Sequence, residues 1–370
     1  MKVLILIETL RIGGIERNAL DQAYQLSDKN EPGIILVFNK LDTYKSANFI
    51  SAEKKLILKK KLDIRFCELG LIRQIKVIRK IIKAEDIDLI IDYTLSGNIK
   101  VRAASALTRK KVMLHCVVQQ LASLSAPIQR YKRMVYAQFA NKLFMNSVNY
   151  GADWSYHINK NLITKFLFKK NFEIIRNGVY LPRLHVKSAD LTVGTPEVAR
   201  FIFLGRLKLW KGINKFKNID FALSGRASFL VIASDKDDEV VKQLIDIFGV
   251  RIQFIFGKTL ADFTPLVGDI NIYPVDYGLN APAIEAVSTN CLEMALLGIP
   301  SIVTVGGTNN WPEIRTVGLV QEVDWEKTSS ILDGIARCRE ISIPYSNFKN
   351  VLNKIDIESN LKAHQRYLNL

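Results

Sequence analysis

Short uninterrupted runs of apolar residues recur along this chain, separated by longer stretches in which apolar residues fall at helical spacing. The first run occupies residues 2–7, and a helical pattern covers residues 19–26. A parallel strand that is covered on both faces has such a run, because neither face meets water. Further strands are predicted in the first half at residues 33–38, 64–69, 87–93, 112–118, 143–146 and 172–175. This alternation is typical of a doubly wound α/β domain.

The pattern is interrupted near Pro182, Gly194 and Pro196, which indicates a linker between domains. It then resumes, with strands predicted at residues 199–204, 228–233, 252–256, 270–274 and 299–305. A chain of 370 residues is too long for one compact core. We therefore expect a first domain at residues 1–185, a second at residues 186–345 and a C-terminal helical segment at residues 346–370.

Positive charge is concentrated in the first half of the chain. The net charge is +16, and residues 1–185 carry 32 Lys and Arg against 15 Asp and Glu, whereas residues 186–370 carry 20 against 21. A one-sided positive field attracts polyanions or an anionic membrane surface. The basic runs are not interleaved with aromatic side chains, so we expect no nucleic acid partner. The helical pattern at residues 71–83 has a wholly cationic polar face, which suits a crossover helix better than direct membrane contact.

Several classes of protein and site do not fit the sequence. The apolar start is interrupted at Glu8 without a cleavage-site pattern, so it reads as a buried strand and not as a signal peptide. No apolar run approaches the length that crosses a bilayer. The four cysteines lack the paired spacing of a zinc site or a disulfide framework. The acids at residues 234–238 suit a turn and a helix start better than a metal site. We expect a cytoplasmic protein without a bound metal.

Residues 285–300 place two carboxylates, Glu285 and Glu293, on either side of a turn that opens a helix. Asn290 is a good N-cap, and Glu293 stands three residues further on. A helix is therefore predicted from this point to Gly298.

The start of this helix is a candidate site for a phosphate. Ser288, Thr289 and Asn290 lie where the unpaired N–H groups and the positive end of the helix dipole meet solvent. A purely structural interpretation explains the segment equally well, with Glu293 as a capping residue and Glu285 as a surface acid.

Glycines, a histidine and two cations follow other predicted strands. Gly13 and Gly14 follow the first strand, where glycine lets the backbone approach a phosphate or a sugar, although a plain tight turn is the commoner reason. His115 closes a strand at the carboxyl edge, where open α/β sheets bind ligands, although a single histidine is usually structural. Arg206 and Lys211 follow the first strand of the second half, where two cations can neutralise a leaving diphosphate.

The order of these residues resembles the retaining GT-B glycosyltransferases of glycosyltransferase family 4, also called glycosyl transferases group 1, over nearly the whole chain. The resemblance departs after Glu285, because Ala286-Val287-Ser288 stands where the family usually has Gly-Phe-Gly. The matching features are Gly13-Gly14, His115, Asn177-Gly178, the Gly-Arg-x-x-x-x-Lys-Gly pattern of residues 205–212, and Glu285 with Glu293 before a small-residue helix and Gly298-Ile299-Pro300.

The resemblance implies two Rossmann-like doubly wound domains that face each other across a cleft, with a C-terminal helix that crosses back onto the first domain. It implies that the ribose lies on Glu293 and the diphosphate on Arg206 and Lys211. The implied catalytic residues are His115, Glu285, Arg206 and Lys211. The implied donor-binding residues, together with the helix start, are Gly13, Gly14, Arg206, Lys211, Gly257, Lys258, Ser288, Thr289, Asn290 and Glu293.

The expected activity is retaining, metal-independent transfer of a hexose-type sugar from a UDP- or GDP-linked donor, without a cofactor. The expected acceptor is a hydroxyl of a lipid-linked or cell-envelope glycan, such as a bacterial lipopolysaccharide core. Because the first half is basic, we expect peripheral contact with the inner face of the plasma membrane. Two alternatives remain: a nucleotide-sugar epimerase or phosphorylase on the same fold, and a non-catalytic polyanion-binding protein.

Overall fold

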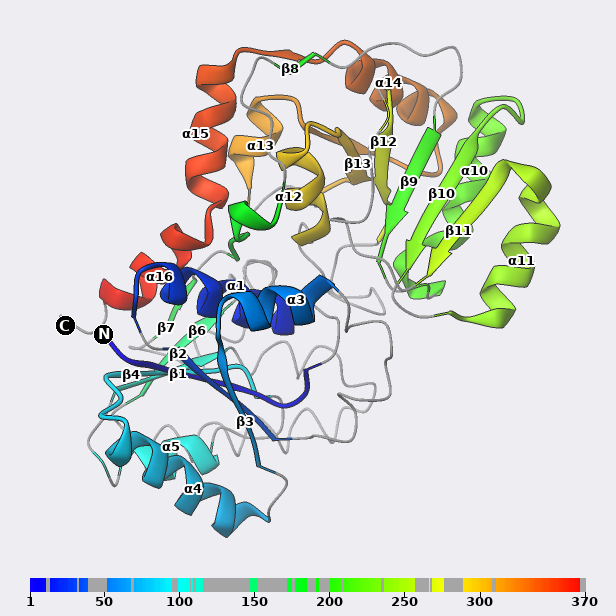
Figure 1. The fold of residues 1–370 in the computed structure, drawn as a ribbon. Coiled ribbons are helices and arrows are strands. Elements are labelled where there is room, and N and C mark those ends of the chain that lie inside the picture. Colours follow the sequence, from blue (N-terminus) through cyan, green and yellow to red (C-terminus); the bar gives the residue numbers. More distant parts are fainter. Residues whose placement is uncertain are drawn as a thin grey trace. The chain divides into compact units, whose positions relative to one another are not determined.

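The structure is a computed structural model of the 370-residue chain. The chain forms two compact units, Met1–Tyr180 with Ile357–Leu370, and Leu181–Asp356, and each unit is described by itself. Most elements of both are labelled in Figure 1. The described residues are 1–10, 14–31, 33–38, 52–67, 70–94, 99–106, 108, 111–115, 147–151, 172–174, 177–184, 191–192, 200–205, 207, 209–233, 236–256, 266, 268–275, 289–307 and 311–366.

The first unit is built on a parallel sheet with the strand order β3-β2-β1-β4-β5-β6-β7. The order of the strands along the chain reverses between β1 and β4. These strands are β1 (Val3–Ile7), β2 (Gly33–Val37), β3 (Asp63–Phe66), β4 (Leu89–Asp92), β5 (Lys111–His115), β6 (Ser147–Gly151) and β7 (Phe172–Ile174).

Both faces of this sheet are covered, as the uninterrupted apolar runs predict. In β1, Val3 and Ile5 pack into one core, whereas Leu4 and Leu6 pack into another on the opposite face. Successive side chains of a strand point to opposite faces, so every residue of β1 is buried. The first core lies under α1 (Gly14–Asp28), α3 (Ala52–Lys59) and α16 (Ile357–Arg366), and the second lies under α4 (Leu71–Ala84) and α5 (Ile99–Ala106).

The second unit has a parallel sheet with the order β11-β10-β9-β12-β13-β14. Its order reverses between β9 and β12. The strands are β9 (Arg200–Leu204), β10 (Ser228–Ala233), β11 (Ile252–Phe256), β12 (Ile270–Tyr273), β13 (Ser301–Thr304) and β14 (Val320–Val323). The helices are α10 (Phe216–Ala222), α11 (Asp238–Phe248), α12 (Thr289–Leu296), α13 (Pro312–Thr316), α14 (Thr328–Arg339) and α15 (Tyr345–Ile355).

Aromatic side chains fill much of the core of the second unit. Phe216 of α10 stacks on Phe229 of β10 with ring centroids 5.1 Å apart, and Phe248 of α11 packs on the same ring. A separate antiparallel pair joins β8 (Leu191–Thr192) to β15 (Ser342–Ile343). The α/β architecture of both units confirms the predicted fold class.

Differences from the predicted elements arise where burial is partial. The strand predicted at residues 143–146 lies outside the described residues, and β6 begins after it at Ser147. Neither β14 nor the short pair of β8 with β15 is predicted, because an edge strand such as Val-Gln-Glu-Val is buried only at its ends and lacks an apolar run. The helical segment expected at residues 346–370 is two helices, of which α15 belongs to the second unit and α16 to the first.

The C-terminal helix α16 crosses back onto the first unit, as expected (Figure 1). Gln22 of α1 donates a hydrogen bond from Nε2 to Oδ1 of Asn360, at 2.7 Å. The backbone N–H of Ile357 donates to the carbonyl oxygen of Val179, and a Cβ on Gly178 would lie 2.5 Å from the Ile357 Cα. Glycine is therefore required at position 178, because the first residue of α16 packs directly against its backbone. Within the described part of the chain, no helix has the length and apolar character needed to span a membrane.

Candidate functional site

The candidate site lies at the carboxyl edge of the second unit's sheet, where the strand order reverses between β9 and β12. Open α/β sheets bind ligands at this position, because the connections after the two strands run to opposite faces and leave a crevice. Three segments meet here: the connection after β9, the end of β12, and the start of α12.

Lys211 projects from the connection after β9 and is 8% exposed. Its ammonium donates a hydrogen bond to the hydroxyl of Tyr273, at 2.8 Å, and lies 5.2 Å from the centroid of that ring. Tyr273 is the last residue of β12 and is buried. The pair therefore holds a positive charge with little water around it at the carboxyl end of a strand, where its field acts strongly on an anion.

Gly212, the next residue, fixes how the connection after β9 packs. It has φ +75°, and a Cβ at this position would lie 2.0 Å from the carbonyl oxygen of Pro274. Only glycine satisfies both the left-handed backbone and this close approach. The Lys-Gly order of the sequence pattern thus has a physical cause: the glycine lets the chain pass against the end of β12, and this contact places Lys211 beside Tyr273.

Asn290 links α12 to the end of β9. Its Nδ2 donates a hydrogen bond to the carbonyl oxygen of Leu204, the last residue of β9, at 2.7 Å. The prediction that Asn290 is the N-cap is wrong, because α12 begins at Thr289 and Asn290 lies in its first turn. The side chain is used for a tertiary contact and not for closing the helix end. The start of α12 is consequently anchored beside the connection that carries Lys211.

Glu293 lies one turn further along α12 and has no exposed surface. All residues of this helix except Asn290 are buried, so Glu293 is not a solvent-exposed capping residue. A buried carboxylate costs free energy unless its surroundings compensate for lost hydration, which marks the position as unusual. A ribose contact at Glu293, as the resemblance implies, requires a local rearrangement that exposes its side chain.

The other predicted site residues divide into two groups. Gly14 is the first residue of α1, and His115 is the last residue of β5, at the carboxyl edge of the first unit's sheet as predicted. Gly13, Arg206, Gly257, Lys258, Glu285 and Ser288 lie outside the described residues.

Sequence reasoning missed Tyr273. A polar-tipped aromatic residue at the last position of an otherwise aliphatic buried strand was the available signal, since a buried tyrosine hydroxyl needs a hydrogen-bond partner. The predicted helix start after the acids at residues 234–238 is confirmed, because Asp237 caps α11 by accepting from the backbone N–H of Val240. The described side chains include no group of three His, Cys, Asp or Glu suited to holding a metal ion.

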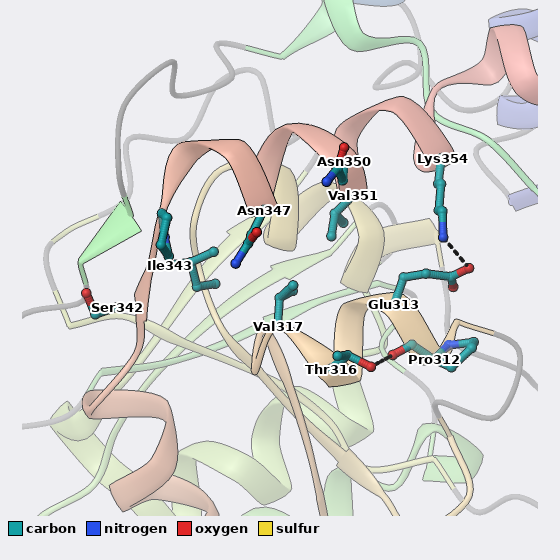
Figure 2. A pocket seen from close by; sticks show the side chains of 11 residues that line it. Pro312, Glu313, Thr316, Val317, Ser342, Ile343, Asn347, Asn350, Val351 and Lys354 are labelled. Atoms are coloured by element: carbon teal, nitrogen blue, oxygen red, sulfur yellow. Dashed lines mark hydrogen bonds and ion pairs between the residues drawn. The ribbon is translucent and has the colours of Figure 1, made fainter.

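A groove of about 630 Å³ lies elsewhere in the second unit, between α13 and α15 (Figure 2). Lys354 forms an ion pair with Glu313 at 3.1 Å, and Asn347 and Asn350 of α15 also line it. Its described lining includes none of the predicted site residues, so the groove is separate from the candidate site.

No protein-family model matches the sequence, and no curated protein matches it. Solved structures do resemble it. A glycosyltransferase from Rickettsia africae ESF-5 superimposes with a TM-score of 0.69 at 14% identity, over 99% of this chain and 97% of that one. Anabaena HepE in complex with UDP-glucose gives 0.66 at 17% identity, over 100% and 99% of the two chains. The apo form of the lipopolysaccharide outer core galactosyltransferase WaaB gives 0.58 at 14% identity, over 99% of each chain. The chain therefore has the GT-B fold.

Proposed function

We propose that this protein is a glycosyltransferase that moves a hexose-type sugar from a nucleotide diphosphate sugar to a hydroxyl group of an acceptor. The observation that carries the proposal is the buried ammonium of Lys211, held by Tyr273 at the point where the strand order of the second sheet reverses. Its position suits the diphosphate of a nucleotide sugar. The similar Anabaena HepE was solved in complex with UDP-glucose, which supports the same class of donor here.

The donor binds to the second unit in this proposal. Lys211 and Arg206 hold the diphosphate, and the first N–H groups of α12, at Thr289 and Asn290, add the positive end of a helix dipole. Glu293 binds the ribose hydroxyls once its side chain is exposed. The nucleobase lies against the backbone of Gly257 and Lys258, and the base is uracil or guanine.

Catalysis follows from charge placed where the transition state needs it. As the bond between the sugar and the diphosphate breaks, negative charge builds on the phosphate oxygens, and Lys211 and Arg206 stabilise it without a metal ion. The departing phosphate receives the proton of the attacking hydroxyl on the same face of the sugar, which retains the anomeric configuration. His115 and Glu285 orient the sugar.

The acceptor in this proposal is a lipid-linked or cell-envelope glycan held by the first unit at the inner face of the plasma membrane. Support comes from α4, which exposes Leu71 and Ile72 by 55% and 71% at its start. In this proposal the exposed cations of α4 face anionic lipid headgroups. They are Arg73, Lys76, Lys80 and Lys83.

Sedimentation with vesicles tests this membrane contact. We expect binding to vesicles that contain phosphatidylglycerol, and weaker binding for Ile72→Ser than for the control Leu58→Ser, which alters an equally exposed leucine on α3. Equal affinity for neutral phosphatidylcholine vesicles contradicts a contact led by charge.

Donor turnover tests the activity itself. A panel of nucleotide sugars is screened by thermal shift, since a ligand that binds only the folded state raises the melting temperature. The best donor is then incubated with the protein, and release of free nucleoside diphosphate is measured. We expect Lys211→Met to slow this release, because the transition state loses about 2–4 kcal/mol of stabilisation. Lys217→Met, which alters an exposed position on α10, should leave the rate unchanged.

Three outcomes overturn the proposed activity. An isomerised donor without free nucleoside diphosphate identifies an epimerase, and a sugar phosphate that forms only when inorganic phosphate is added identifies a phosphorylase. Salt-sensitive RNA binding, together with no calorimetric response to any nucleoside diphosphate, identifies a non-catalytic polyanion-binding protein.

A further inference from the structure

The sheet of the first unit has its own reversal of strand order, between β1 and β4. The carboxyl ends of these two strands are a second position at which such sheets bind ligands. Three charged residues occur there: Glu8 follows β1, Asp92 ends β4, and Lys100 lies in the first turn of α5, which follows β4. Sequence reasoning selected none of them.

Lys100 is buried with little to compensate its charge. It is 3% exposed, and the nearest carboxylate oxygen, Oε2 of Glu8, lies 3.6 Å from its Nζ, beyond hydrogen-bonding distance. The ammonium also lies 3.5 Å from the ring centroid of Phe38, which follows β2. In the part of the chain that the structure describes, the Lys100 ammonium makes no hydrogen bond. The three N–H donors of the Lys100 ammonium therefore have only one long ionic contact and one aromatic ring face near them. Burying a cation costs free energy unless it is well paired.

Two acids lie at these strand ends, and one of them reaches solvent. The side chain of Glu8 is 30% exposed. The hydroxyl of the next residue, Thr9, donates to Oε1 of Glu16 at 3.1 Å, which ties the end of β1 to the first turns of α1. Asp92 is fully buried, and its Oδ1 accepts hydrogen bonds from both the N–H and the hydroxyl of Thr94.

We propose that Lys100 and Glu8 form a subsite for one ring of a neutral sugar. A hydroxyl group both donates and accepts, so one ring oxygen substituent accepts from the Lys100 ammonium while its neighbour donates to the Glu8 carboxylate. A ligand of this kind supplies the hydrogen bonds that the buried ammonium does not make within the described chain. An anion such as phosphate fits less well, because the carboxylates of Glu8 and Asp92 flank the same strand ends and repel negative charge.

This inference rests on the proposed function, since in a glycosyltransferase the sugar at this subsite belongs to the acceptor. It also separates two kinds of cation in the basic first half of the chain. The cations of α4 are exposed, whereas Lys100 is buried beside the carboxylate of Glu8 at the sheet edge. The acceptor ring is thereby recognised through its hydroxyl groups and not through a negative charge.

Saturation-transfer NMR on the full chain tests the subsite, with the methyl α-glycosides of glucose, galactose and mannose as probes and inorganic phosphate as the rival ligand. We expect one or more glycosides to bind the wild type, and both Lys100→Met and Glu8→Gln to weaken binding about tenfold, as expected for the loss of a hydrogen bond to a charged group. Lys100→Arg retains part of the affinity, and Lys59→Met, an exposed position on α3, retains all of it. Thermal unfolding of each variant shows whether the fold is intact.

Three results overturn the subsite: no glycoside binds, glycoside binding is unchanged in both Lys100→Met and Glu8→Gln, or phosphate binds in place of the glycosides. A merely structural role would lower the melting temperature and leave the affinity of the folded fraction unchanged. Calorimetry with UDP and GDP on the same samples separates this inference from the proposed function. Normal nucleotide binding without glycoside binding rejects the subsite alone, whereas glycoside binding without any nucleotide binding rejects the proposed function and leaves the subsite standing.

Discussion

Tyr273 holds Lys211 through a hydrogen bond of 2.8 Å between the phenol oxygen and the ammonium. Tyr273 is the last residue of β12, whereas Lys211 lies in the connection that follows β9. This contact fixes the position of the Lys211 ammonium, so Tyr273 is a positioning residue for the proposed diphosphate site.

Tyr273→Phe should weaken nucleoside diphosphate binding while leaving the fold intact. The variant keeps the ring but removes the hydroxyl, and the ammonium loses a charge-assisted hydrogen bond worth about 1.5–3 kcal/mol. We expect the Kd of UDP or GDP to rise about tenfold, with a smaller effect on the monophosphate, which has no second phosphate for Lys211. Isothermal calorimetry measures both ligands, with Tyr345→Phe on α15 as the control. An equal loss for mono- and diphosphate contradicts the positioning role.

Gly212→Ala should disrupt the candidate site through a backbone clash. The new Cβ would lie 2.0 Å from the carbonyl oxygen of Pro274, in addition to the strain of φ +75°. We expect a loss of about 2 kcal/mol or more in the free energy of unfolding, together with weaker nucleotide binding.

Gly225→Ala is the matched control for this variant. It has nearly the same backbone angle, φ +76°, but a Cβ there meets nothing within 4 Å. Chemical unfolding of the two variants separates strain from clash. If both lose the same stability, the contact with Pro274 does not determine the effect.

Gly178→Ala should detach α16 from the first unit. A Cβ at Gly178 would lie 2.5 Å from the Cα of Ile357, where the neighbouring group is backbone and cannot rotate away. We expect destabilisation of about 1–3 kcal/mol and faster hydrogen exchange in α16. Gly70→Ala is the control, because a Cβ at Gly70 has open space. Unchanged exchange in α16 would mean that this contact does not hold the helix.

His364 should make stability fall as the pH falls below about 6.5. Its Nδ1 lies 2.8 Å from the carbonyl oxygen of Asn360 and donates to it, and complete burial lowers the pKa of the imidazole from 6.5 to about 4. Between these values the unfolded chain binds the proton and the folded chain does not, so stability is complete above pH 6.5 and declines toward pH 4. The expected loss is about 3 kcal/mol.

Urea unfolding at pH 5 and pH 7.5 measures this effect, with His364→Gln as the comparison. The nearby Glu358 has a pKa lowered from 4.5 by hydrogen bonds to Lys29 and Lys362, so its contribution is lost only below pH 4.5. The interval from pH 5 to 6.5 therefore reports mainly on His364. A variant with the same pH dependence as the wild type excludes the histidine as its source.

The strands buried on both faces could be predicted from the sequence, because burial leaves an apolar run. The strand β10 was predicted with its observed bounds, and β1 and β9 within one residue. The edge strand β14 escaped prediction because Gln321 and Glu322 are only partly buried there. A run of apolar residues reflects burial on both faces, and an edge strand that is only partly buried has a weaker run.

The candidate site was predictable where it depends on backbone geometry. Lys211 and Gly212 could be selected because they belong to a recognisable local sequence pattern. The contact of Lys211 with Tyr273 joins positions 62 residues apart and leaves no such pattern. Asn290 shows the opposite failure, since its residue type suits a helix cap but a tertiary hydrogen bond to Leu204 uses the side chain.

The return of α16 to the first unit determines when the core of that unit can form during synthesis. Ile357 and Leu361 belong to the same core as Val3 and Ile5, so residues translated before the second unit and residues translated after it are packed together. Synthesis proceeds from the N-terminus, and the second unit is therefore fully translated before the first has all of its core. A chain that stops at Asp356 leaves that core open, and premature termination is expected to yield aggregates in place of a soluble first unit.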